Sequence, residues 1–185
     1  IIVASIPAGV VGILWDDVFT KYFYNYQTVA IMLILVGVVF ILVERANKNK
    51  VARVDSIDDI SYGQAFMIGV FQMIAAIFPG TSRSGSTIVG SLMLGISRTA
   101  AAEFTFFLAV PAMFGGSAIK ILKYDGGFNS SEVALLAIGM IVAFVLSIIA
   151  IKFLMSYIKK HDFKAFGWYR IVLGVAVIGY FLATR

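Results

Sequence analysis

Long stretches without charged residues alternate with short basic loops along this chain. A membrane-spanning helix needs about 20 consecutive, mostly apolar residues. Four stretches meet this requirement: Tyr22–Val43, Thr99–Ile119, Val133–Ile151 and Ala165–Thr184. The second of them carries Glu103, and Pro111 is expected to interrupt it. The pattern predicts an all-α, polytopic membrane protein whose residues 1–185 form a single membrane domain.

The stretch from about 60 to 95 has a different pattern. An apolar arm, long enough for a helix, leads into the polar, glycine-containing nonapeptide PGTSRSGST at positions 79–87. The apolar segment that follows, Ile88–Gly95, is too short to cross a bilayer. Two apolar arms around a polar tip predict a re-entrant helix hairpin. Irregular backbone at membrane depth is tolerated only where it is buried in protein or lines a watery cavity, so this tip is a candidate site.

The positions of the basic residues support such a hairpin. If residues 60–95 enter and leave the membrane on one side, eight basic residues share that side and four lie on the other. The eight are Arg45, Lys48, Lys50, Arg53, Arg98, Lys159, Lys160 and Lys164, and the four are Lys21, Lys120, Lys123 and Arg185. Because cytoplasmic loops are enriched in Lys and Arg, the richer side is expected to be cytoplasmic.

Composition narrows the function classes. The chain is 61% hydrophobic and 14% charged, with a net charge of +5 and no Cys. Soluble domains are about 45–50% apolar, so a soluble domain is excluded, and so is a disordered chain. Without Cys there is no disulfide, thiolate metal site or Cys nucleophile. The positive charge is interpreted as a topology signal beside membrane spans, and no nucleic-acid partner is expected.

The nonapeptide carries the chemistry. Ser82, Arg83 and Ser84 place two hydroxyl groups beside a planar guanidinium, which suits phosphate oxygens. Glycines allow the tight turns that aim consecutive N–H groups at an anion, and the start of the following helix favours negative charge. We therefore assign catalytic roles to Arg83, Ser82 and Ser84. The residues assigned to bind the substrate phosphate are Gly80, Thr81, Gly85, Ser86, Thr87 and Gln72. The alternative is a polar helix break in which Arg83 pairs with a carboxylate on another helix.

Three other polar residues are interpreted from their places on the predicted helices. Gln72, on the first arm, either orients a ligand or joins helices, and Gln64 more simply joins helices. Glu103 either suits the dipole at the start of its helix or pairs with Arg83 or Arg98. The sequence lacks clustered carboxylates and a well-placed His, so an enzyme would need its base, nucleophile and metal ligands from elsewhere.

Three motifs in order resemble the integral-membrane undecaprenyl-diphosphate phosphatase family, also called the bacitracin-resistance protein family. They are SYGQAFMIGVFQ at 61–72, FPGTSRSGSTI at 78–88 and GISRTAAAEFTFFLAVP at 95–111. The family's PGxSRSG motif is present as Pro79, Gly80, Ser82, Arg83, Ser84 and Gly85. Its first motif, a glutamate-bearing helix and a Ser-rich loop ending in His, has no match. Because the chain starts with Ile1 inside an apolar run, we expect a fragment truncated at its N-terminus.

The resemblance implies a hydrolase acting on a phosphoric anhydride, which converts undecaprenyl diphosphate to the monophosphate carrier used in peptidoglycan synthesis. It implies a bundle of two inverted halves in the bacterial inner membrane, an extracytoplasmic site, and a divalent cation (Mg²⁺ or Ca²⁺) with no ligands in this fragment, which alone would be inactive. The expected partners are a polyprenyl diphosphate and membrane lipids, and homodimerisation stays open. The rival function is a transporter or flippase for a polyprenyl-phosphate lipid or anionic solute.

Overall fold

The computed structural model describes residues 1–124, 126–127 and 129–184, and of Asp16 and Asp17 only the backbone. Arg185, one of the four basic residues expected on the poorer side, lies outside the described residues. The elements are α1 (Ile2–Phe23), α2 (Tyr26–Asn47), the 3₁₀ turn η1 (Ile57–Asp59), α3 (Tyr62–Ile77), α4 (Arg83–Met93), α5 (Arg98–Leu122), α6 (Ser130–Ile158) and α7 (Lys164–Ala183). Within the described ranges the regular secondary structure is helical, which confirms the predicted all-α class.

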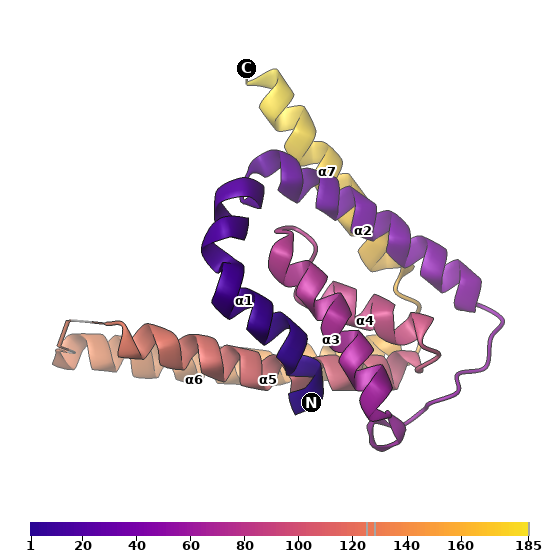
Figure 1. The fold of residues 1–185 in the computed structure, drawn as a ribbon, viewed down its shortest axis with the longest axis horizontal. Helices are drawn as coiled ribbons and strands as arrows, with labels where there is room; N and C mark the ends of the chain where they lie inside the picture. The colour runs from indigo at the N-terminus through magenta and orange to yellow at the C-terminus, as the bar shows by residue number, and fades with distance from the viewer. Residues whose placement is uncertain (125, 128, 185) are drawn as a thin grey trace.

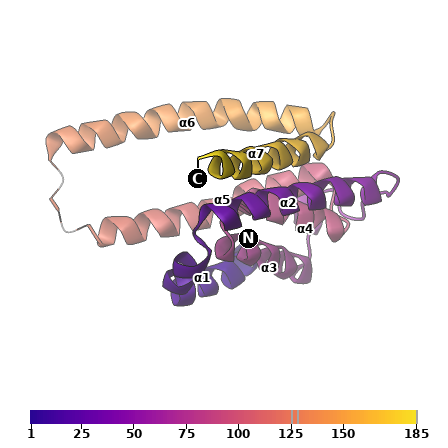
Figure 2. The same ribbon diagram turned by 90° about the horizontal axis from the view of Figure 1, so that it is seen from above.

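Four of these helices, α2, α5, α6 and α7, are long and apolar enough to cross a membrane. They match the four predicted spans. Figure 2 shows α5 and α6 as a long antiparallel pair that extends beyond the other helices. The predicted interruption at Pro111 is wrong, because α5 is continuous through that residue. A Pro inside a membrane helix is tolerated where neighbouring groups satisfy the freed backbone.

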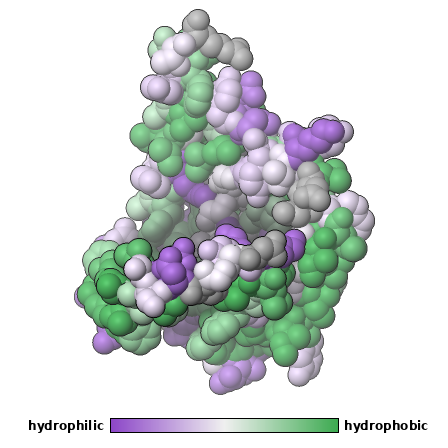
Figure 3. Space-filling view, turned by 90° about the vertical axis from the view of Figure 1, so that its left-hand side faces the viewer, coloured by the Kyte–Doolittle hydropathy of each residue, from purple (hydrophilic) through white to green (hydrophobic). Residues whose placement is uncertain are grey.

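The molecular surface is dominated by apolar side chains, most clearly on α6. Large residues such as Leu135, Phe144 and Phe153 are 70%, 67% and 71% exposed. The face drawn in Figure 3 is broadly hydrophobic, with hydrophilic residues in separate patches. Soluble monomers rarely expose contiguous apolar area of this extent. The surface therefore agrees with a multi-pass membrane protein.

Small residues allow α2 and α7 to cross closely. A Cβ atom added at Gly37 of α2 would lie 2.7 Å from the carbonyl oxygen of Gly167 on α7. Membrane helices use small residues in this way because close backbone approach increases van der Waals packing. In Figure 1, α2 and α7 lie side by side above the α3–α4 pair, and α1 lies along α3.

Helices α3 and α4 form an antiparallel hairpin inside this frame (Figure 1). The second arm begins at Arg83, five residues before the apolar segment from which it was predicted. The hydroxyl-rich residues therefore form the first turn of a helix, because Ser82 caps it and polar residues are well tolerated there. At 11 residues, α4 is about 16 Å long, roughly half the thickness of a bilayer core. That length fits the predicted re-entrant hairpin, which stays a prediction.

The predicted grouping of the basic loops is visible at one end of the bundle. The buried carboxylate of Glu44, at the end of α2, accepts hydrogen bonds from Nε of Arg98 (3.0 Å) and from the backbone N–H of Phe163 (3.1 Å). These contacts join the C-terminal end of α2, the start of α5 and the α6–α7 loop. The α5–α6 connection lies at the opposite end (Figure 2). We use the name loop end for the end of the bundle at which Glu44, Arg98 and Phe163 meet.

Candidate active site

The tip of the hairpin is pressed against α2. Gly80 has a φ of +88°, and a Cβ atom there would lie 2.5 Å from the carbonyl oxygen of Val29. Only glycine combines this backbone conformation with so close an approach. The backbone N–H of Thr81 then donates to the carbonyl of Phe78 (3.3 Å), which closes the turn before α4. Gly80 therefore shapes the tip.

Ser82 is held in a strained conformation at the start of α4. Its φ is +64°, which makes it the described non-glycine residue with a positive φ. Its Oγ accepts a hydrogen bond from the backbone N–H of Gly85 (3.2 Å) and lies 3.3 Å from Oγ of Ser84. Strain of this kind persists only where surrounding structure enforces it, and it gathers at functional sites. Two hydroxyl groups are thus brought together at the first turn of a helix.

Arg83 is the first residue of α4 and is half-buried. In the part of the chain that the structure describes, its guanidinium forms no hydrogen bond or ion pair. The alternative in which Arg83 pairs with a carboxylate on another helix therefore finds no support among these residues. A guanidinium at this position, next to two serines and a helix N-terminus, is placed to meet an anion.

A second arginine reaches the tip from α7, and sequence reasoning missed it. Arg170 donates from Nη1 to the carbonyl of Thr81 (3.2 Å) and from Nη2 to the carbonyl of Gly80 (3.3 Å). Its position within a membrane-spanning stretch was the available signal, because such charges are functional by default. The neighbouring Trp168 and Tyr169 instead favour an interfacial interpretation of this arginine, which hides its role.

The tip opens onto a cavity of about 140 Å³. Ser82, Ser84 and Gly85 line one part of it together with Arg170, whereas Arg83 is not among its lining residues. The remaining wall is largely apolar and is formed by α2, α4, α5, α6 and α7, with Phe40, Ile88, Phe106, Leu154, Ile158, Phe163 and Phe166. A cavity with hydroxyls and a guanidinium at one side and aromatic and aliphatic walls elsewhere suits an amphiphilic, anionic ligand.

Thr87 and Ser86, both assigned to phosphate binding, are buried in the first turns of α4. Oγ1 of Thr87 lies 2.9 Å from Oγ1 of Thr105 on α5, and it also donates to the carbonyl of Arg83 or Ser84. Ser86 is buried. The geometry therefore favours a structural role for Thr87, which joins α4 to α5.

Two buried polar atoms near this region have no hydrogen-bond partner among the described residues. They are Oε1 of Gln72, in a side chain that is 4% exposed, and Oγ1 of Thr81, in one that is 1% exposed. An unsatisfied buried polar group costs about 1–3 kcal/mol. Both atoms are available to a bound group, which keeps these two residues as candidate ligand contacts.

Gln64 has a local role that its sequence context could have indicated. It forms a capping box with Ser61, in which each side chain bonds the other residue's backbone N–H, and its Nε2 also donates to the carbonyl of Leu94 (3.4 Å). Ser-x-x-Gln before an apolar run is the signature of this motif. The expected joining of helices is present, and the cap was missed.

The expected ion pairs of Glu103 are not formed. Arg98 pairs with Glu44, and among the described residues neither Arg98 nor Arg83 bonds Glu103. Glu103 also lies beyond the first turn of α5, so the helix dipole does not explain it. The partner of Arg98 was misjudged because Glu44 lies 54 residues away in sequence.

The donor set around the tip does not fit a divalent cation. Hydroxyls, N–H groups and guanidinium groups gather there, whereas Mg²⁺ and Ca²⁺ need several oxygen ligands with carboxylates among them. Within the described ranges, no group of three or more His, Cys, Asp or Glu side chains lies close enough together to hold a metal. His161 is exposed and stacks on Tyr157, 4.4 Å between ring centroids. The donors at the tip suit an anion better than a cation.

Comparison of the sequence with known proteins shows the family to which the chain belongs. The family described as bacitracin resistance protein BacA matches residues 1–176. The chain is 66% identical to an undecaprenyl-diphosphatase of Desulfitobacterium hafniense over 99% of its own length, and 60% identical to undecaprenyl-diphosphatase 1 of Clostridium acetobutylicum over 98%. A third relative, an undecaprenyl-diphosphatase of Enterococcus faecalis, is 58% identical over 95% of the chain.

These matches cover 66%, 66% and 63% of the three relatives, so the chain spans just under two-thirds of their length. The match runs through the hairpin, the tip with its hydroxyl cluster, and most of α7 with Arg170. The chain therefore belongs to the bacitracin resistance protein BacA family.

Proposed function

We propose that this chain is part of a membrane-bound undecaprenyl-diphosphate phosphatase, which releases phosphate from undecaprenyl diphosphate and leaves undecaprenyl phosphate. The observation that carries the proposal is the cavity in which Ser82, Ser84 and Arg170 face a largely apolar wall. A lipid diphosphate is both anionic and apolar, and it matches the two parts of this cavity. The names of the three relatives support the same reaction.

The residues of the tip act on the charge of the diphosphate. Hydrolysis forms a bond from a water or side-chain oxygen to the terminal phosphorus and breaks the bond to the bridging oxygen, which leaves on the lipid monophosphate. Negative charge spreads over the phosphoryl oxygens in the transition state. Arg83 and the hydroxyls of Ser82 and Ser84 stabilise that charge, and the tip is preformed, so little reorganisation is needed.

Arg170 acts as a positioning residue. Its guanidinium bonds the carbonyls of Gly80 and Thr81, so it holds the turn that carries Ser82 and Arg83. The backbone N–H of Gly85 is donated to Oγ of Ser82, so Gly85 acts on the phosphate through the shape and dipole of the first turn of α4. The unpaired hydroxyl of Thr81 can donate to a phosphate oxygen, whereas the unpaired Oε1 of Gln72 only accepts, from a protonated phosphate oxygen or a water. Together these groups bind and orient the phosphate.

The nucleophile and general base come from residues outside the described site. The described tip presents no carboxylate or His beside Ser82 and Ser84, and serine needs such a base to attack. The divalent cation expected from the family resemblance likewise needs ligands from elsewhere. We therefore assign this chain the phosphate-binding part of the active site.

The cellular setting follows from the substrate and the charges. We place the protein in the bacterial plasma membrane with the loop end in the cytoplasm, because that end is rich in Lys and Arg. We propose that the active site faces the extracytoplasmic side, because the hairpin tip lies at the start of α4, away from the loop end. Release of the monophosphate carrier supports peptidoglycan synthesis and cell shape, and consumption of the diphosphate gives resistance to bacitracin. Homodimerisation is a further proposal.

Phosphate release from a long-chain prenyl diphosphate tests the proposal. The full-length protein in detergent is expected to release phosphate, and Arg83→Ala to lower kcat about 100- to 1000-fold, the effect of removing one preorganised donor. Arg45→Ala, an exposed arginine at the loop end, is the matched control and is expected to keep full activity.

Two results would count against it. If the wild-type protein releases no phosphate above background while it carries lipid across vesicles, the transporter alternative is correct. If the wild-type protein is active and Arg83→Ala is equally so, the reaction stands and the assignment of Arg83 is wrong.

A further inference from the structure

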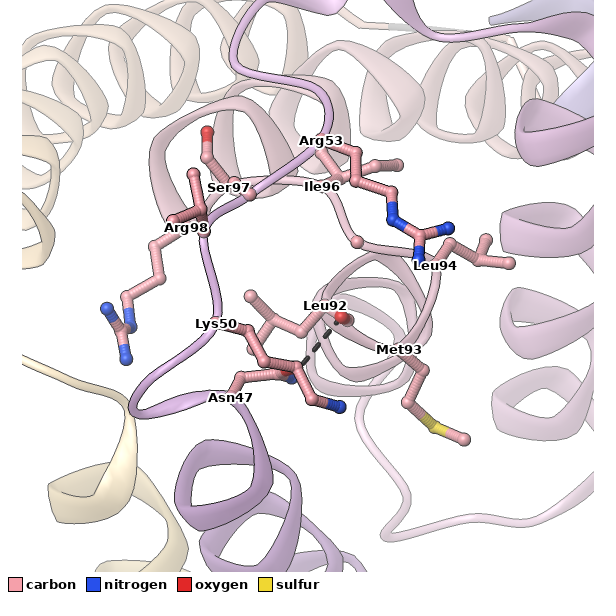
Figure 4. Close-up of a pocket in the computed structure, with 12 residues that line it drawn as sticks. Asn47, Lys50, Arg53, Leu92, Met93, Leu94, Ile96, Ser97 and Arg98 are labelled. Carbon is pink, nitrogen blue, oxygen red and sulfur yellow. Dashed lines mark hydrogen bonds between the residues drawn. The ribbon is translucent and has the colours of Figure 1, made fainter.

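A cavity separate from the candidate active site lies at the loop end. Its volume is about 210 Å³, and it is enclosed by the loop that follows α2 and the turn that joins α4 to α5 (Figure 4). Helix α4 separates it from the hairpin tip, because Arg83 begins that helix and Met93 ends it. With a rise of 1.5 Å per residue, the two regions are about 16 Å apart.

The walls of this cavity are held in place by hydrogen bonds between its two segments. The side-chain amide of Asn47 donates to the carbonyl of Leu92 (3.3 Å). The backbone N–H of Arg53 donates to Gly95 (2.8 Å), and that of Ser97 donates to Val54 (2.8 Å). Val54 and Ile96 also form an isolated β-bridge. The cavity is therefore preformed.

The charged side chains that line the cavity are all positive, and most of them form no ion pair. Lys50, Arg53 and Arg98 line it, and no acidic residue is among its lining residues. Arg98 is engaged by Glu44, and in Figure 4 its guanidinium points away from the other two side chains. Lys50 and Arg53 form no ion pair in the described part of the chain. Two cations therefore remain available to a ligand.

The end of α4 does not cancel this charge. The last carbonyls of a helix carry partial negative charge and would repel an anion when unpaired. Here the carbonyl of Leu92 accepts from Gly95 and from the Asn47 amide, and that of Ser91 accepts from Leu94 and Ile96. These two carbonyls are satisfied within the protein, which leaves an anion as the favoured ligand.

Apolar side chains at the rim indicate what the anion is attached to. Val51 is 91% exposed and Met93 is 59% exposed, and both line the cavity. A small inorganic anion gains nothing from such groups, whereas a lipid buries apolar surface against them. The cavity also lies at the end of the bundle where the spanning helices α2 and α5 terminate, and the ends of spanning helices are where headgroups are expected.

We propose that this cavity binds the phosphate headgroup of an anionic membrane lipid. Lys50 and Arg53 contact the phosphate, and Val51 and Met93 contact the apolar part of the same molecule. This site is distinct from the hairpin tip and does not depend on the proposed phosphatase activity.

Binding of dioleoyl phosphatidylglycerol to the purified protein in neutral detergent tests the proposal, with bound lipid counted by native mass spectrometry. The double variant Lys50→Ala/Arg53→Ala is expected to lower the affinity at least about tenfold, because each removed group loses a charge-assisted hydrogen bond. The matched control is Arg45→Ala/Lys48→Ala, which removes the same charge from exposed residues outside the cavity. It is expected to change the affinity less than about threefold.

The same measurement identifies the source of the phosphate. Phosphatidylcholine is expected to bind weakly. Inorganic phosphate in the millimolar range is expected to leave the lipid bound. The variant Val51→Ser is expected to weaken lipid binding. Equal losses in the two double variants would mean general surface attraction and overturn the proposal. Displacement by inorganic phosphate at the concentration of the lipid would overturn the assignment to a lipid. Circular dichroism confirms that each variant keeps its helices.

Discussion

Ser82 shows how one residue combines strain with chemistry. Its positive φ lies in a region that L-residues rarely adopt, and its hydroxyl both caps α4 and faces the cavity. A residue chosen only for the turn would be glycine, which adopts this backbone without strain. A serine retained in this conformation is explained by a task for its hydroxyl.

Ser82→Gly is expected to separate the two roles. Glycine relieves strain of about 1–3 kcal/mol, and glycine at an N-cap costs only a few tenths of a kcal/mol. The variant should therefore unfold at the same or a higher temperature than the wild type, while phosphate release falls. Thermal unfolding in detergent and a phosphate-release assay measure the two effects. Ser82→Ala is the companion variant, and we expect it to lose both stability and activity. A Ser82→Gly protein with undiminished turnover would remove Ser82 from the catalytic group.

At the scale of helices, the close packing of α2 on α7 positions the tip of the α3–α4 hairpin. Val29 of α2 contacts Gly80, and Arg170 of α7 bonds the carbonyls of Gly80 and Thr81. The crossing of these two helices therefore sets where the nonapeptide lies. Glycines allow the two helices to approach this closely at the crossing, since Gly37 faces Gly167 with no room for a Cβ atom.

Gly37→Ala is expected to destabilise the protein by about 1–3 kcal/mol, the usual cost of overpacking. Its Cβ atom would meet a backbone oxygen at 2.7 Å, and backbone cannot turn aside as a flexible side chain can. Gly139→Ala on α6 is the matched control, because nothing lies within 4 Å of its added Cβ atom. The control should be neutral or slightly stabilising, since Ala favours helix. Chemical unfolding in detergent compares the two, and equal stability in both would mean that the α2–α7 distance adapts freely.

For the whole molecule, the central question is how it sits in the membrane. The loops that carry most of the basic residues meet at the loop end, where Glu44 joins α2, α5 and the α6–α7 loop. The α5–α6 connection lies at the other end (Figure 2). The arrangement agrees with one transmembrane axis whose two ends differ in positive charge.

Single cysteines are expected to be labelled from opposite sides of the membrane. Residues 1–185 include no Cys, so an introduced thiol is the one reactive thiol among them. Lys123→Cys, at the end of α5, should react with a membrane-impermeant maleimide on intact cells. Lys159→Cys, at the end of α6, should react only after the membrane is opened. Labelling of Lys159→Cys alone on intact cells would reverse the proposed orientation.

Much of the fold and part of the site could be predicted because their signals are local in sequence. A run of apolar residues must bury its backbone polar groups in its own hydrogen bonds within lipid, so length and hydropathy alone locate the four spans. The nonapeptide likewise shows its chemistry directly, since hydroxyls, glycines and an arginine are adjacent. The start of α4 at Arg83 was harder to predict, because polar residues favour a helix only where a cap such as Ser82 precedes them.

The contacts that assemble the site depend on tertiary structure. Arg170 lies 89 and 90 residues from the two carbonyls that it bonds, Arg98 lies 54 residues from Glu44, and Thr105 lies 18 residues from Thr87. No local pattern identifies such partners, because a guanidinium or carboxylate bonds whatever polar group packing brings near it. The sequence by itself located the four spanning helices and predicted a phosphate site in the nonapeptide. Only the packing of those helices decided that Arg170 supports the tip, that Arg98 pairs with Glu44, and that an apolar cavity opens beside Ser82 and Ser84.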